Sequence, residues 1–170
     1  TISRNGDLVG RMYLEHQIVT AAASGDNNYG TQIIDNVELE IGGQSIDKHY
    51  GHWMEAYLEL TEPNPTGDKY TMEAAGATTS SQPTRIQNMA AAGGVTGAGI
   101  EYDNLIFVPF LFWFCRNPGL ALPLIALQYH EVKCIIQLCT DAQLGSVSPA
   151  ISTSQLKLWA EYIYLDTDER

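Results

Sequence analysis

Two histidines three positions apart, His49 and His52 in the segment DKHYGH, are the residues of this chain whose types and spacing could hold a metal. A zinc site needs further nitrogen, sulfur or oxygen ligands in a defined geometry. The other histidines, His16 and His130, stand in separate segments that have the pattern of strands. The favoured interpretation of the pair is a turn followed by the start of a helix, so no metal ligand and no cofactor are predicted.

Two further segments could do chemistry but lack essential residues. Near residue 170, a calcium loop built on Asp166, Asp168 and Glu169 would need a glycine at its bend and a distal glutamate. This cluster, which includes Arg170, is therefore predicted to be a solvated strand end. The segment GVTGAG at 94–99 lacks the Lys-Ser/Thr ending and the preceding strand of a phosphate loop. With no Gly-x-Ser-x-Gly turn either, no catalytic residue is predicted, and the chain is not expected to be an enzyme.

The charge balance argues against nucleic acid as a partner. The 170 residues include 9 Lys and Arg against 20 Asp and Glu, a formal net charge of −11. Binding to phosphates needs several cations on one face, so no direct contact with nucleic acid is expected. Charged residues make up 17% of the chain, below the usual ~25%. That deficit indicates association with copies or partners.

The cysteines indicate no redox chemistry. Cys115, Cys134 and Cys139 are odd in number and form no Cys-x-x-Cys pair. Cys134 lies within an apolar alternation, which favours a buried, reduced thiol and folding in the cytosol.

Apolar and polar residues alternate in four segments, residues 8–19, 33–43, 129–138 and 156–165, with the two-residue period of strands. The residues predicted to face a core are Leu8, Met12, Leu14, Ile18, Ile33, Val37, Leu39, Ile41, Val132, Cys134, Ile136, Leu138, Leu156, Leu158, Tyr162 and Tyr164. The residues predicted to face water are Arg11, Glu15, Gln17, Asn36, Glu38, Glu40, Glu131, Lys133 and Gln137. Strands with one dry face are typical of antiparallel sheets.

Two other regions complete the predicted architecture. The segment GHWMEAYLELT at 51–61 carries apolar residues at helical spacing and is soon followed by Pro63. Residues 62–103 are rich in Gly, Ala, Ser, Thr and Pro, which predicts a long exposed loop insertion. The sequence therefore predicts an all-β, antiparallel sandwich or jelly roll with one short helix and a long loop.

The apolar segment FWFCRNPGLALPLIALQYHEVK at 112–133 is too interrupted to cross a membrane. A spanning helix needs about 20 predominantly apolar residues. Arg116, Pro118 and Pro123 break the run before that length, so no membrane insertion is predicted.

A family resemblance rests on four segments. The chain contains, in this order, RNGDL at 4–8, VELEIGGQSIDKHYGHWMEAYLELT at 37–61, FWFCRNPGLALPLIALQYHEVK at 112–133 and LWAEYIYLDTDER at 158–170. Together they resemble the major capsid protein of the nucleocytoplasmic large DNA viruses, and more narrowly its N-terminal jelly roll. The resemblance fails only over residues 62–103.

The resemblance implies a structural protein of the virion, made in the host cytoplasm. Residues 1–170 would form a single jelly-roll domain, incomplete at its N-terminal strand, that is the first half of a double jelly roll. Three chains would form a homotrimer of pseudo-hexagonal outline that contacts neighbouring capsomers and minor capsid proteins in an icosahedral shell. The alternatives are a minor capsid or spike protein with the same fold, and a metal-dependent jelly-roll enzyme or lectin that uses His49 and His52.

In such a fold, residues 104–114 would be a strand that ends at a corner formed by residues 116–119. We expect Gly119 to supply a backbone conformation that other residues resist, and Arg116 to bond to several loop carbonyls or to a carboxylate. Residues 120–127 would be an apolar connection buried under neighbouring structure.

Overall fold

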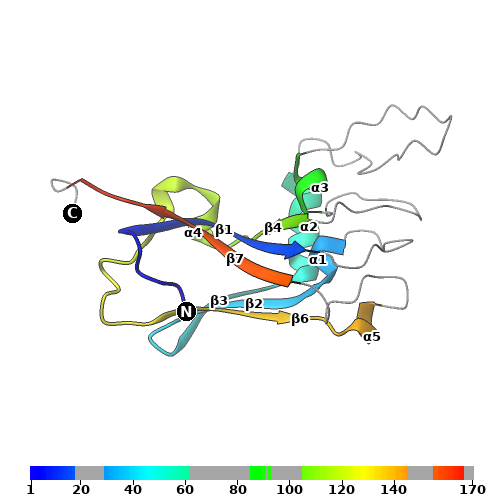
Figure 1. Cartoon of the computed structure of the whole chain (residues 1–170), viewed down its shortest axis with the longest axis horizontal. Helices are drawn as coiled ribbons and strands as arrows, with labels where there is room; N and C mark the ends of the chain where they lie inside the picture. Colours follow the sequence, from blue (N-terminus) through cyan, green and yellow to red (C-terminus); the bar gives the residue numbers. More distant parts are fainter. Residues whose placement is uncertain (18–28, 62–84, 91, 93–104, 145–154, 167–170) are drawn as a thin grey trace.

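Two antiparallel sheets face each other across one hydrophobic core in the computed structural model (Figure 1). The structure describes residues 1–17, 29–61, 85–90, 92, 105–144 and 155–166. The strands of the larger sheet are β1 (Leu8–Gln17), β4 (Leu105–Pro109), β5 (Leu122–Pro123) and β7 (Gln155–Ile163). The strands of the smaller sheet are β2 (Ile34–Ile41), β3 (Gln44–Tyr50) and β6 (Val132–Leu138).

Each sheet is organised around one central strand. In the larger sheet, β7 pairs with the same β1 residues as β4 and β5 do, so it occupies the opposite edge of β1. In the smaller sheet, β2 lies between β3 and β6. Within the part of the chain that the structure describes, every strand except β1 and β2 therefore has one unpaired edge.

Alternation along the central strands places their apolar residues in the core, as predicted. Met12 and Leu14 of β1, and Val37 and Leu39 of β2, are all buried. The core is completed by aromatic rings that follow β4, among them Phe110 and two stacked rings whose centroids are 5.5 Å apart. Such rings bury a large area each and supply much of the energy of a core.

Four predicted orientations are wrong. Asn36 was expected to face water and is 6% exposed, and Tyr164 was expected in the core and is 69% exposed.

The other two wrong orientations lie in the larger sheet. Glu15 was expected to face water, but it is only 6% exposed, because Lys157 and Trp159 of β7 reach across its carboxylate. Leu158 was expected in the core and is 41% exposed. Alternation gives the period of a strand, but it does not reveal which neighbours cover each face.

The strand β3 replaces the turn that the sequence favoured around His49. The turn lies earlier, at Gly42 and Gly43, whose φ angles are +60° and +84°. β3 returns along β2 from these glycines, and Val37 lies opposite His49. A pair of glycines between two strands is a hairpin signal, so β3 could have been found from the sequence.

The predicted helix is confirmed as α2 (Gly51–Thr61), which buries Met54 and Leu58. The expectation of a single short helix is wrong. The other short helices are α1 (Tyr29–Gln32), α3 (Arg85–Ala90), α4 (Trp113–Arg116), the 3-10 turn η1 (Pro118–Leu120) and α5 (Asp141–Leu144). Helices this short carry too few residues to show a 3.6-residue period. None of the described helices is long and apolar enough to cross a membrane.

The segment 62–103 is described only at α3 and Ala92. Ala90 and Ala92 are fully buried and pack with Leu58 of α2. This part of the segment therefore differs from the exposed loop that its composition predicts. The remaining residues of the segment lie outside the described residues.

The apolar segment after β4 also differs from its prediction. The strand expected over residues 104–114 ends at Pro109, and its last residues form the first part of α4. In the connection at 120–127, Leu122 and Leu124 are buried, whereas Leu120 and Ile125 are 52% and 41% exposed. The connection covers the core with one side only.

Candidate functional site

The four histidines lie in different surroundings and do not form one site. His49 is the penultimate residue of β3 and is buried, whereas His52, three residues later, is exposed in the first turn of α2. His16 is buried within β1, and His130 is exposed in the turn before β6. Among the residues that the structure describes, no three His, Cys, Asp or Glu side chains gather to hold a metal.

His49 is a neutral side chain of the core. Its ring packs edge-on against Phe112, with centroids 4.7 Å apart, and against Phe110. Burial lowers its pKa, Asp47 opposes that shift and Arg116 adds to it. Its Nε2 atom has no hydrogen-bond partner in the described part of the chain. Because the imidazole faces aromatic rings, it serves packing rather than proton transfer.

His16 is held in a similar way in the other sheet. Its Nε2 atom lies 2.8 Å from the hydroxyl of Tyr29 in α1, and burial lowers the pKa of its imidazole to about 4. The ring is therefore neutral at physiological pH. This bond ties α1 to the larger sheet.

The cysteines are free thiols of low reactivity. Burial raises the pKa of Cys115 to about 11 and that of Cys134 to about 12. Thiolate is the nucleophilic form of cysteine, so neither residue is activated for catalysis. This agrees with the prediction of reduced thiols.

The remaining candidates from the sequence form no site in the described structure. Asp166 is exposed after the end of β7. Its predicted neighbours Asp168, Glu169 and Arg170 lie outside the described residues, and so does the segment 94–99.

Sequence reasoning missed a surface cavity of about 540 Å³ that His52 lines together with Asp35, Glu55 and Cys139. These residues come from α2, β2 and the chain just after β6, so no local spacing could bring them to notice. Glu55 accepts a hydrogen bond of 2.7 Å from the Thr31 hydroxyl, which fixes its carboxylate within the fold.

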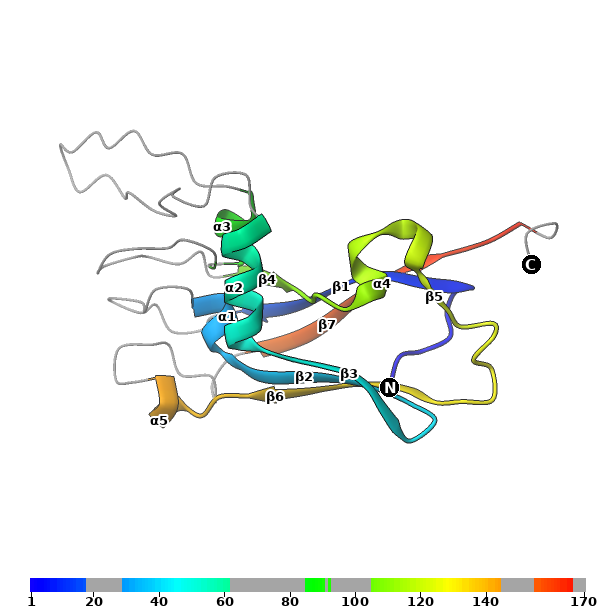
Figure 2. The same ribbon diagram turned by 180° about the vertical axis from the view of Figure 1, so that it is seen from behind.

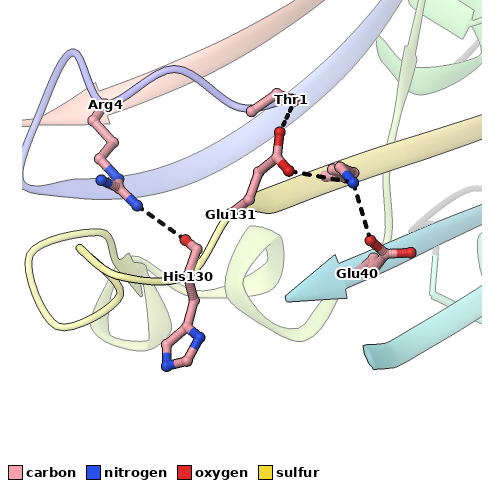
Figure 3. Close-up of polar contacts among 6 residues, drawn as sticks. Thr1, Arg4, Glu40, His130 and Glu131 are labelled. Atoms are coloured by element: carbon pink, nitrogen blue, oxygen red, sulfur yellow. Dashed lines mark hydrogen bonds and ion pairs between the residues drawn. The ribbon is translucent and has the colours of Figure 1, made fainter. Parts of the chain in front are cut away.

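A polar network fastens the N-terminal residues to the smaller sheet and the turn before it (Figure 3). The Arg4 guanidinium donates to the carbonyls of Leu127 and His130, both at 3.0 Å. The Thr1 hydroxyl donates to Glu131 at 2.7 Å, and Lys133 bridges Glu131 to Glu40 of β2. Exposed ion pairs contribute little stability each, so the network mainly fixes the path of the chain.

Arg116 at the end of α4 bonds to one loop carbonyl of the described chain, where the sequence predicted several carbonyls or a carboxylate. Its Nε atom donates to the carbonyl oxygen of Leu111 at 3.1 Å, and its guanidinium lies 5.2 Å from the ring centroid of Tyr57. The side chain thereby joins α4 to α2, which stands on the same side of the larger sheet (Figure 2).

The edge strands carry the most conspicuous surface of the molecule. Leu158 and Trp159 of β7 are 41% and 53% exposed, and Ile135 of β6 is 43% exposed. On β3, Ile46 and Tyr50 are exposed as well. Exposed apolar side chains beside unpaired strand edges are features of surfaces that other chains cover. The described residues thus offer contact surfaces rather than a reaction centre.

Comparisons with known proteins agree with this character. The model of the family described as "Major capsid protein N-terminus" matches residues 1–166. The major capsid protein of Pyramimonas orientalis virus is 46% identical over 99% of this chain and 40% of its own length. That of Phaeocystis pouchetii virus is 38% identical over 100% of this chain and 39% of its own length. The chain thus spans about two fifths of these relatives.

A solved structure is similar as well. A quasi-atomic model of the PBCV-1 virus capsid is 35% identical and has a TM-score of 0.70, over 99% of this chain and 38% of the capsid chain. This likeness confirms the predicted antiparallel jelly-roll fold.

Proposed function

We propose that this chain, which belongs to the major capsid protein family of large DNA viruses, is the first of two jelly rolls in a subunit that trimerises. Proteins of this family are structural components of the virion, so the prediction of a non-enzymatic protein is confirmed. The proposed trimers have a pseudo-hexagonal outline and tile an icosahedral shell beside other capsomers and minor capsid proteins. Synthesis in the host cytoplasm belongs to the same proposal.

The observation that carries the proposal is the condition of β7. One edge of this strand pairs with β1 over eight residue pairs, and no strand pairs with its other edge within the described residues. Leu158 and Trp159 are exposed on it. A free monomer would leave this edge open to aggregation. The unpaired edge therefore supports an assembly in which another chain or domain covers β7.

The test is the composition of purified particles. The native polypeptide should be about two and a half times as long as this chain, since the chain spans 40% of the Pyramimonas orientalis virus protein. Sedimentation of the released protein should show a trimer. A particle protein of 170 residues that remains a monomer would contradict the proposal. The copy number per particle distinguishes a major subunit from a minor capsid or spike protein, because a major subunit must be the most abundant protein of the shell.

A further inference from the structure

The lysines and arginines of this acidic chain differ in whether they form ion pairs. Lys48 pairs with Glu38, Lys157 pairs with Glu15, and Lys133 pairs with two glutamates. Arg4 is held by backbone carbonyls. In the described part of the chain, Arg11 and Arg116 take part in no ion pair.

These two arginines line the same groove. The groove has a volume of about 320 Å³ and lies between β1, α2, α3 and the chain from β4 to α4. Both side chains belong to exposed residues. Among the described residues, a chain with a net charge of −11 thus places two cations that form no ion pair along one concave surface.

The groove also has an apolar lining. Tyr57 and the buried Leu58 of α2 contribute to it, and so do the buried Phe110 and Leu111. In Figure 2, β4 and the chain after it run from α2 to α4, so the lining residues come from segments that are separate in sequence. An apolar surface flanked by cations suits a segment that combines an apolar side chain with a carboxylate.

The Arg116 guanidinium is prepared for such a ligand. Its Nε bond to the Leu111 carbonyl and its position over the Tyr57 ring fix the plane of the fork. That bond uses Nε. A carboxylate can bind in bidentate fashion to the guanidinium edge formed by the two terminal nitrogens. Little side-chain entropy remains to be lost when a carboxylate binds.

We propose that this groove receives an acidic segment of a second copy of the chain, with a carboxylate on Arg11 and Arg116 and an apolar side chain against Tyr57. The inference rests on the proposed self-assembly. This part of each copy carries a charge of −11, and like charges on neighbouring copies repel one another. A contact between them needs local cations that are not already neutralised, and in the described structure these two meet that need.

The first experiment identifies the occupant. Assembled capsid protein carrying Arg11→Lys, made as an equal mixture of 14N and 15N chains, is treated with a carbodiimide that joins amines directly to carboxylates. The expected product is a peptide pair of mixed isotopes that links the new lysine to an Asp or Glu of another copy. Links confined to one copy, no link at position 11, or a link only to a different protein would each overturn the proposal.

The second experiment measures the energetic role. Arg11→Glu is expected to weaken self-association about tenfold at low salt, with a smaller loss at high salt, because the contact is electrostatic. Lys48→Glu is the matched control, since it makes the same change of charge at an exposed cation outside the groove. Unchanged association of Arg11→Glu, or an equal loss in the control, would overturn the proposal. Wild-type protein that does not assemble at all would instead count against the proposed function.

Discussion

The β2–β3 hairpin and the corner after α4 both turn the chain at a glycine, but they are held by different means. In the hairpin, Gly42 and Gly43 have φ angles of +60° and +84°, which other residues adopt at a cost. In the corner, Gly119 has no positive φ, and an added Cβ would meet only the Asn117 Oδ1 atom, at 3.5 Å. The expectation that Gly119 supplies a special conformation is therefore wrong.

The corner depends on its side chains. The Asn117 Oδ1 atom accepts a hydrogen bond of 2.9 Å from the backbone amide of Gly119 and caps η1. Arg116 bonds to the Leu111 carbonyl on the other side of the turn. The comparison teaches that a glycine in a turn identifies the turn, but not whether the backbone or the neighbouring side chains hold it.

The largest effect should come from Gly42→Val. The substitution places a β-branched residue at positive φ, and its Cβ would lie 2.8 Å from the His130 Nδ1 atom. Strain and overpacking together should lower the free energy of unfolding of the intact protein by about 3 kcal/mol. Urea unfolding followed by tryptophan fluorescence measures this loss. Wild-type stability would mean that the hairpin does not depend on its backbone conformation.

Gly43→Ala separates conformation from crowding. This glycine also has a positive φ, but an added Cβ would meet nothing within 4 Å. The expected loss in the free energy of unfolding is about 1–2 kcal/mol, from the left-handed backbone alone. A loss as large as that of Gly42→Val would show that the contact with His130 contributes nothing.

Asn117→Ala tests the side-chain support of the corner. Removal of a capping acceptor typically costs about 1 kcal/mol, and the same unfolding measurement should show that loss. Asn117→Asp is the control, because it keeps the oxygen that accepts from the Gly119 amide. Equal losses in both variants would assign the effect to something other than the cap.

The smallest effect is expected for Gly119→Ala. The backbone at this position suits any residue and the added methyl has room, so the free energy of unfolding should change by less than about 0.5 kcal/mol. A loss of more than about 1 kcal/mol would remove the distinction between the two turns.

Much of the sandwich could be predicted from the sequence, because the central strands β1 and β2 each present one face to the core. Glu15 and Leu158 were misplaced for a different reason. Their burial depends on the residues that lie across the sheet. Lys157, which covers Glu15, is more than 140 positions away from it in the sequence. The groove at Arg11 and Arg116 was missed for the same reason, since it joins segments that are distant in sequence.

The short elements escaped prediction because they contain too little pattern. α4 has four residues and follows a run of aromatic residues that a strand would equally accommodate. The family resemblance predicted the fold correctly, but it could not supply the local geometry of this corner.

The two buried histidines lower the free energy of unfolding of this protein in acid. His16 and His49 are neutral in the folded chain, because burial holds the pKa of His16 at about 4 and lowers that of His49 as well. In the unfolded chain, both would titrate near their ordinary pKa of ~6.5. Between pH ~6.5 and about 4, the unfolded chain binds protons at these histidines and the folded chain does not. Their contribution to the free energy of unfolding is therefore full above pH ~6.5 and declines as the pH falls toward 4. One histidine lies in each sheet, so acidification opposes the packing of both halves of the sandwich at once.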